Sequence, residues 1–180
     1  DVKAKKILRT FSTKSSWTKV LTLSSDGKKL YASNWVGNDV SEINLEMGAF
    51  VRKIPTVKAP RGLYVTSAGR YLYVAGFENG DIQKIDLATG KGKIVFSTGG
   101  AMRHFAADEA NGILFVSDMG TNTIWKVSLA QDVVEKFATT DNNPNTIVLS
   151  PDKKVLFVSW RGKNFSADNY YKPGPEWGTV

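Results

Sequence analysis

The segment Leu72–Tyr73–Val74–Ala75 decides how this chain is organised, because similar segments recur with a constant spacing of 42 residues, at positions 30, 72, 114 and 156. The other three copies read LYAS at 30–33, LFVS at 114–117 and LFVS at 156–159. Constant spacing of this kind is typical of repeat proteins, in which each unit packs against its neighbours. Individual residues are therefore best interpreted by their position within the repeat.

Each repeat is predicted to contain four short β-strands. In the first unit, apolar and β-prone residues cover 20–24, 29–34, 40–44 and 50–54, and turn signals such as Asp26–Gly27 separate them. The second and third units repeat this order, and no window has the 3.6-residue apolar period of a helix. A repeat of this length with four meandering antiparallel strands is typical of one blade of a β-propeller.

We expect a single all-β propeller domain with about four blades present. The expected units are a lone outer strand with its connection at 1–17, blades at 18–59, 60–101 and 102–143, and an incomplete blade at 144–180. In this last unit an insertion at 160–177 lengthens the loop, and the chain stops where a third strand would begin. We favour a part of a larger ring; the alternative is a ring of four blades that the lone N-terminal strand closes.

The repeats resemble those of the YVTN-type β-propeller family. The matching residues are SSDGKKLY at 24–31, LYVA at 72–75, KIDLATG at 84–90 and SPDKKVLF at 150–157, and the resemblance extends over essentially the whole chain. The chain departs from the pattern at Asn44 and Ser128, where the repeat has an aspartate such as Asp86. The resemblance implies a seven-bladed propeller in an exported bacterial protein, periplasmic or extracellular. It implies no catalytic residue, because the motif is structural.

Composition excludes several kinds of site. The chain has no cysteine, which removes disulfides, thiolate metal sites and cysteine nucleophiles. His104 is the only histidine, so a site with several histidine ligands is impossible within these residues, and we predict neither a metal nor a cofactor. No apolar run is long enough for a transmembrane helix.

The net charge of +7 raises the possibility of nucleic-acid binding. Most of the excess lysines and arginines fall on the predicted outermost strands, where they protect a sheet edge against mispairing. At the opposite, loop-bearing part of each blade, acidic residues roughly balance the basic ones. Nucleic acid is therefore not an expected partner.

The loops that enter the first strands and those that join second to third strands should meet at one end of the propeller, here called the loop-rich face. Equivalent positions in the four units carry Lys19, Arg61, Arg103 and Asn145. Cations at a channel mouth could bind a carboxylate, phosphate or other anion, with arginine binding it bidentately. Alternatively, these are solvated loop residues, or they pair with Asp39 and Asp118.

Two further features of this face have both a functional and a structural interpretation. His104 could be a general base or a haem ligand, or a hydrogen-bonded histidine at the start of a strand. The aromatic residues of the insertion could form a recognition surface, or the loop could pack on itself. The candidate binding residues are Lys19, Trp35, Arg61, Arg103, His104, Asn145, Trp160, Arg161, Tyr170, Tyr171 and Trp177.

The sequence favours a non-enzymatic scaffold that binds a protein or a small anionic ligand through the loop-rich face. The remaining blades of the same propeller would be its other partners. The alternative is a haem- or quinone-linked redox enzyme, a lactonase-like enzyme or a subunit of one, and this alternative rests on analogy between folds alone.

Overall fold

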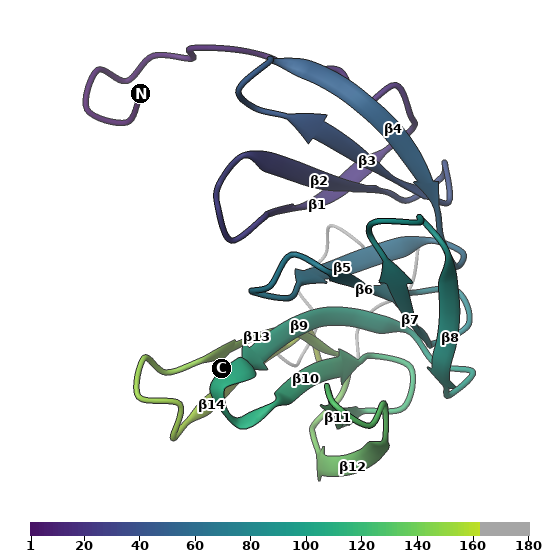
Figure 1. Ribbon diagram of the computed structural model, residues 1–180. Helices are drawn as coiled ribbons and strands as arrows, with labels where there is room; N and C mark the ends of the chain where they lie inside the picture. Colours follow the sequence, from purple (N-terminus) through teal and green to yellow (C-terminus); the bar gives the residue numbers. More distant parts are fainter. Residues whose placement is uncertain (163–180) are drawn as a thin grey trace.

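The computed structural model describes residues 1–162, in which the repeats form three four-stranded antiparallel sheets and one two-stranded sheet (Figure 1). Blade 1 contains β1 (Thr18–Leu23), β2 (Lys29–Asn34), β3 (Asp39–Asn44) and β4 (Ala49–Pro55). Blade 2 contains β5 (Pro60–Val65), β6 (Tyr71–Gly76), β7 (Asp81–Asp86) and β8 (Gly92–Ser97). Blade 3 contains β9 (Met102–Asp108), β10 (Ile113–Asp118), β11 (Thr123–Ser128) and β12 (Val134–Thr139), with a single 3₁₀ turn, η1 (Glu109–Asn111), after β9. Blade 4 is represented by β13 (Pro144–Leu149) and β14 (Leu156–Trp160).

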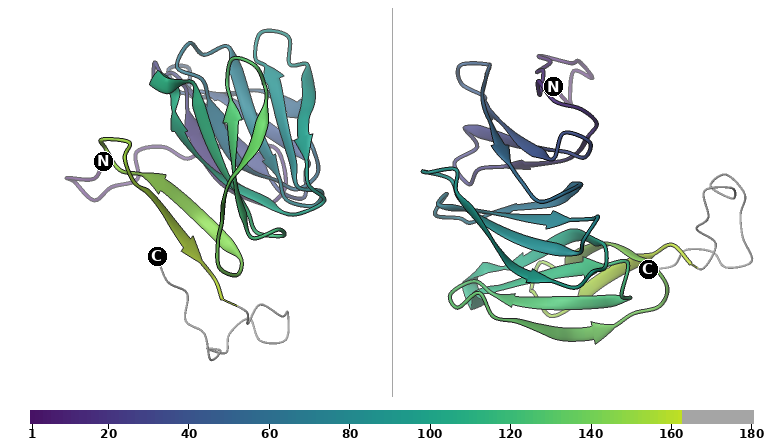
Figure 2. Two further views of the ribbon diagram at one scale, coloured as in Figure 1. Left: turned by 90° about the horizontal axis from the view of Figure 1, so that it is seen from below. Right: turned by 90° about the vertical axis from the view of Figure 1, so that its right-hand side faces the viewer.

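Within each sheet, strands that follow one another in the chain are hydrogen-bonded neighbours. The first strands of successive blades, β1, β5, β9 and β13, contact one another in turn, and the sheets stack side by side as a fan (Figures 1 and 2). The predicted all-β fold with four-stranded antiparallel blades is therefore confirmed.

The hydrophobic core lies between the blades rather than within any one of them. Val40 and Ile54 of blade 1 pack with Leu63, Leu72 and Ile85 of blade 2 in one buried cluster. Burial of such a layer stabilises the stack because about 25 cal/mol is gained for each Å² of apolar surface removed from water. A blade is consequently stable only when a neighbour covers its face.

Third strands show which side chains face which neighbour. Their second residue packs toward the following blade: Ile82 shares a cluster with Met102 and Leu114 of blade 3. Their fifth residue packs toward the preceding blade: Val127 of β11 lies in that same cluster with Ile82. Each third strand therefore bridges two interfaces.

The predicted lone strand in residues 1–17 does not form. Residues 2–5 make a turn, and the described chain contains no strand before Thr18. A strand requires a hydrogen-bonded neighbour, and no strand of residues 18–162 pairs with this segment. Figure 1 places the N-terminal segment beside blade 1, at the opposite end of the stack from β13 and β14, so it does not complete blade 4 in this structure. Nearly all of the predicted insertion, and the start of a third strand after it, lie outside the described residues.

Candidate binding site on the loop-rich face

Buried aspartates hold the loops of this face in place. The carboxylate of Asp118 is fully buried and accepts hydrogen bonds from the backbone nitrogens of Ala101 (2.8 Å) and Gly120 (3.0 Å) and from the hydroxyls of Thr98 and Thr121 (both 2.7 Å). It thereby ties the loop that enters β9 to the loop between β10 and β11.

Two other blades use an aspartate in the same way. Asp39 accepts hydrogen bonds from Ser15 (2.8 Å) and Asn34 (2.7 Å), and Asp81 accepts one from the Ser97 hydroxyl. Asp39, Asp81 and Asp118 were expected to balance the basic residues of the face, but all three are buried. These three carboxylates are engaged with the loops, whereas Glu78 and Asp141, which belong to the same predicted balance, are exposed.

Basic and aromatic side chains alternate across the face of blades 1 and 2. Nζ of Lys19 lies 4.4 Å from the ring centroid of Trp17 and 5.5 Å from that of Trp35. Cζ of Arg61 lies 5.2 Å from the centroid of Trp35 and 5.8 Å from that of Phe77. The Trp35 and Phe77 rings are themselves in tilted contact, with centroids 4.7 Å apart.

The series continues into blade 3. Cζ of Arg103 lies 5.4 Å from the Phe77 centroid, and its Nη1 donates a hydrogen bond to Sδ of Met119 (3.0 Å). A cation over an aromatic face contributes about 0.5–1 kcal/mol at an exposed site. We call the whole series the cation–aromatic ladder; its members are Trp17, Lys19, Trp35, Arg61, Phe77, Arg103 and Met119.

The repeat register explains why the ladder forms. Positions 19, 61 and 103 are basic and are 42 residues apart, as are the large apolar residues at 35, 77 and 119. Because successive blades have the same backbone, Arg61 and Arg103 are each placed between the apolar residue of their own blade and that of the blade before. Lys19 lies between Trp35 of its own blade and Trp17 of the segment before β1. The order of the predicted strands also places Trp17, Phe77 and Met119 at the loop-rich face, although these three were not among the candidate binding residues.

The ladder passes from solvent at blade 1 to the interior at blade 3. Trp17 is 64% exposed and Lys19 is exposed, whereas Arg103 is only 5% exposed and Met119 is buried. Trp35, Arg61 and Phe77 are intermediate. The exposed part of the ladder therefore extends from Trp17 to Phe77, and Arg103 does not belong to a ring of solvated cations.

A groove of about 500 Å³ lies beside the exposed part of the ladder. The rings of Trp35 and Phe77 contribute to one wall, with Glu78, and backbone of the loops at 99–101 and 120–121 contributes to another. A Cβ atom on Gly120 would lie 2.6 Å from Cα of Gly100, so only glycine allows these two loops to approach so closely. The groove therefore combines aromatic rings with the backbone of two closely packed, glycine-containing loops.

His104 links blade 3 to blade 4. Its Nδ1 lies 3.1 Å from the carbonyl oxygen of Ile147 and donates the hydrogen bond, because a carbonyl oxygen can only accept. Burial lowers the pKa of the imidazole, with the positive charge of Arg103 acting in the same direction. This geometry is that of a hydrogen-bonded histidine near the start of a strand. Within residues 1–162, no three histidine or acidic side chains are grouped so that they could hold a metal ion.

The other predicted residues lie away from the ladder or outside the described chain. The carbonyl of Asn145 accepts a hydrogen bond from the Ser117 hydroxyl (2.7 Å), and the backbone nitrogen of Arg161 donates one to Asn143 (3.2 Å). Trp160 lines a different groove, between blades 3 and 4. Tyr170, Tyr171 and Trp177 lie outside the described residues.

Comparison with known proteins shows the fold and one distant relative. No family model matches the chain. The whole chain is 32% identical to Antigen Lp49 of Leptospira interrogans serogroup Icterohaemorrhagiae, and it spans 41% of the length of that curated relative. No helix within residues 1–162 is both long enough and apolar enough to cross a membrane.

Solved structures similar to the chain confirm the β-propeller fold. Hydrazine synthase of Kuenenia stuttgartiensis has a TM-score of 0.77 and 20% identity, over 89% of this chain and 47% of that one. A chain of a nidogen/laminin complex has a TM-score of 0.69 and 15% identity, over 79% of this chain and 55% of that one. At such identities the likeness concerns the fold alone.

Proposed function

We propose that this chain is a non-enzymatic β-propeller scaffold that binds a protein or a small anionic ligand through its loop-rich face. The observation that carries the proposal is the placement of Lys19 and Arg61 over the ring of Trp35, beside an aromatic-walled groove. Tryptophan and arginine are the residue types that contribute most strongly to protein interfaces.

The ladder suits the recognition of an acidic group. Stacking on Trp35 and Phe77 restricts the guanidinium of Arg61, so less side-chain entropy is lost when it binds a carboxylate or phosphate. Asp39, Asp81 and Asp118 are buried and accept hydrogen bonds from the loops, so their carboxylates are not presented on the surface beside the ladder. The groove beside the rings would receive the apolar part of the same partner.

The fold does not choose between a scaffold and an enzyme, because its structural neighbours include an enzyme and a protein complex. The proposal therefore rests on the ladder. Because the relative is named as an antigen, we extend the proposal to an exported protein, periplasmic or extracellular. We further propose YVTN-type repeats in a ring of seven blades.

The proposal can be tested with poly-L-glutamate as a defined acidic probe. We expect the double variant Lys19→Gln/Arg61→Gln to bind the probe about tenfold more weakly than the wild type, because both ladder cations are lost. Trp35→Ala should also weaken binding, although it leaves the charge unchanged. Isothermal titration calorimetry gives the affinities, and thermal melts show whether the variants remain folded.

Lys3→Gln/Lys5→Gln is the matched control, because it removes the same charge from the exposed N-terminal segment. The control should bind like the wild type. If both double variants lose affinity equally, binding reflects the net charge of +7 rather than a site on the loop-rich face, and the proposal fails.

A further inference from the structure

The groove of about 500 Å³ beside the ladder is bounded by two loops that carry glycine where they approach most closely. Gly100 lies before β9 and Gly120 between β10 and β11, and a Cβ atom on Gly120 would lie 2.6 Å from Cα of Gly100. In the preceding repeat the same two positions are Lys58 and Glu78, which form an ion pair of 3.3 Å. The boundary between blades 2 and 3 therefore has bare backbone where the boundary before it has charged side chains.

The remaining wall of the groove offers aromatic and methyl surface. The rings of Trp35 and Phe77 are in tilted contact, with centroids 4.7 Å apart, and both residues are partly exposed. Ala59 and Ala101 also line the groove and contribute only methyl groups. A space with aromatic rings on one side and little side-chain bulk on the other suits a flat apolar ring, because aromatic pairs prefer offset and edge-to-face contacts.

Charges of both signs border the groove. Cζ of Arg61 and Nζ of Lys19 lie 5.2 and 5.5 Å from the centroid of the Trp35 ring. Glu78 lines the groove itself; its side chain is 55% exposed, and Lys58 contacts its Oε1. A complementary ligand therefore places an acidic group toward the two cations and a hydrogen-bond donor toward Glu78.

Tryptophan is the protein side chain that best combines these properties. Its indole has a large apolar ring system and an N–H group that can only donate a hydrogen bond. Phenylalanine has no donor, and the smaller ring of tyrosine carries a hydroxyl that also accepts. Tryptophan is also among the residues that contribute most to binding at protein interfaces.

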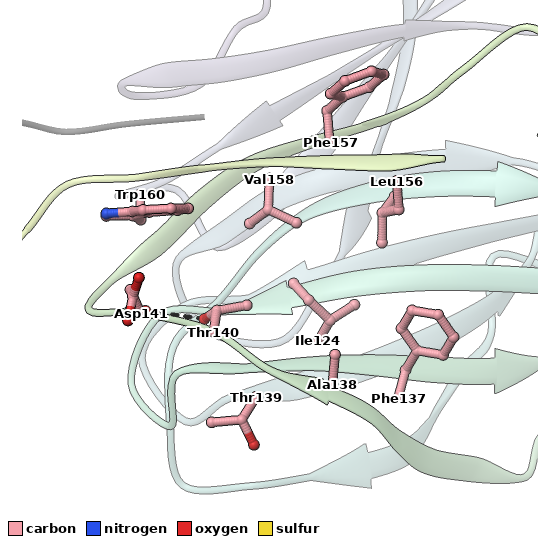
Figure 3. A pocket seen from close by; sticks show the side chains of 10 residues that line it. All are labelled: Ile124, Phe137, Ala138, Thr139, Thr140, Asp141, Leu156, Phe157, Val158 and Trp160. Carbon is pink, nitrogen blue, oxygen red and sulfur yellow. Dashed lines mark hydrogen bonds between the residues drawn. The ribbon is translucent and has the colours of Figure 1, made fainter. Parts of the chain in front are cut away.

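The larger groove of about 610 Å³ between blade 3 and β14 lacks this charge pattern (Figure 3). Its walls include Ile124, Ala138 and Leu156, and none of the described residues that line it is basic. Asp141 lines it near Trp160, so an acidic segment would meet a like charge there. Charge complementarity therefore selects the groove beside the ladder for an acidic partner.

We propose that the groove beside the ladder binds a tryptophan side chain of a protein partner in which acidic residues flank that tryptophan. The indole ring packs on Trp35 and Phe77, and its N–H donates a hydrogen bond to Glu78. The flanking carboxylates pair with Lys19 and Arg61. This inference rests on the proposed function, because it takes the ladder as the site that attracts acidic residues, and it adds the side chain that the groove receives.

The test titrates the 180-residue chain with short, acetylated and amidated peptides of glutamate that differ only in one central residue. A central tryptophan should bind at least about tenfold more tightly than a central glycine, because the groove removes the indole ring from water. Equal affinity of the two peptides would leave the ladder as an acid-binding site and overturn the tryptophan subsite. If neither peptide binds, the proposed function fails as well.

The contact with Glu78 is tested by a third peptide, whose central residue is β-(3-benzothienyl)alanine, in which sulfur replaces the indole N–H. The wild type should prefer tryptophan to this analogue by about threefold to tenfold, because one hydrogen bond to a charged group is lost. Glu78→Ala should abolish the preference, whereas Lys58→Ala removes only the ion-pair partner and should retain it. The preference is a ratio of two affinities, so the altered net charge of each variant cancels. A wild type without the preference, or variants that both lose it, would overturn the proposed contact.

Two alanines that line different grooves locate the bound peptide. Ala101→Phe places a ring in the groove beside the ladder and should remove the advantage of tryptophan over glycine. Ala138→Phe places the same ring in the groove of Figure 3 and should leave that advantage unchanged. The reverse result would assign the peptide to the groove between blade 3 and β14 and overturn the proposal. Thermal melts show whether both variants fold; if Ala101→Phe does not, the exposed Glu78 and Lys58 substitutions still decide.

Discussion

Residues at the same repeat position have different roles in different blades. Lys19, Arg61 and Arg103 all stack on apolar residues of the ladder, yet only Arg103 is buried. The difference arises because loops that Asp118 ties together enclose the last part of the ladder. Repetition in sequence therefore predicts where a side chain lies, while the local loops determine whether solvent reaches it.

We expect His104 to make the stability of the chain depend on pH near neutrality. Burial lowers the pKa of its imidazole below the ordinary value of about 6.5. In the window between the two pKa values the unfolded chain binds more protons than the folded chain, so the free energy of unfolding falls as the pH falls through this window. We expect urea midpoints of the wild type to fall as the pH is lowered below about 6.5.

The variant His104→Gln should lack this dependence. Because His104 is the only histidine, no second imidazole can mask the effect. Urea denaturation of both proteins between about pH 5 and pH 8 makes the comparison. Parallel curves for the two proteins in that range would show that His104 does not titrate differently on folding.

At the scale of strands, Gly62 sets the distance between the first strands of blades 2 and 3. A Cβ atom on Gly62 would lie 2.6 Å from the carbonyl oxygen of Arg103 and 3.1 Å from Cα of His104. Both atoms belong to the backbone of β9, which cannot move away without separating the blades. The same repeat position is valine, histidine or threonine in the other blades, so the glycine is needed for this contact only.

Gly62→Ala should therefore lower the free energy of unfolding by about 1–3 kcal/mol, the usual cost of overpacking. Chemical denaturation provides the measurement. Thr146→Ala is the matched control: it alters the same repeat position in β13, where the side chain is exposed, and should change stability by less than about 0.5 kcal/mol. A neutral Gly62→Ala would mean that β5 and β9 are not so closely packed.

At the scale of the whole molecule, burial depends on whether a neighbouring blade is present. Leu63 of β5 is 8% exposed because it packs against blade 1, whereas Leu21, at the same position in β1, is 59% exposed. In the 180-residue chain, Leu63→Ala should cost about 2–4 kcal/mol of unfolding free energy, as buried leucines usually do. Leu21→Ala should cost less than about 1 kcal/mol.

Thermal and urea unfolding of the two variants compare these costs directly. The substitution and the strand position are identical, so the difference isolates the effect of the neighbouring blade. Equal costs at both sites would show that the face of blade 1 carrying Leu21 is covered in solution.

Much of the fold could be predicted because each repeat contains its own strand and turn signals. The 42-residue spacing placed the strands of three blades within about three residues of their observed bounds. The N-terminal strand was predicted wrongly because residues 2–12 have the composition of an outer strand but lack a paired neighbour. Hydrogen-bond pairing is a property of two segments, and one segment cannot reveal it.

The candidate site was predicted less completely than the fold. The repeat placed Lys19, Arg61 and Trp35 on one face, since residues 42 apart occupy equivalent places in successive blades. Three features depend on contacts that distant segments make: the stacking of those side chains, the burial of Arg103, and the hydrogen bonds that Asp118 accepts from the loops. The local sequence determines the repeat period and the turns. The exposure of each side chain is decided only when segments distant in the sequence exclude water from one another, so it became apparent only in the tertiary structure.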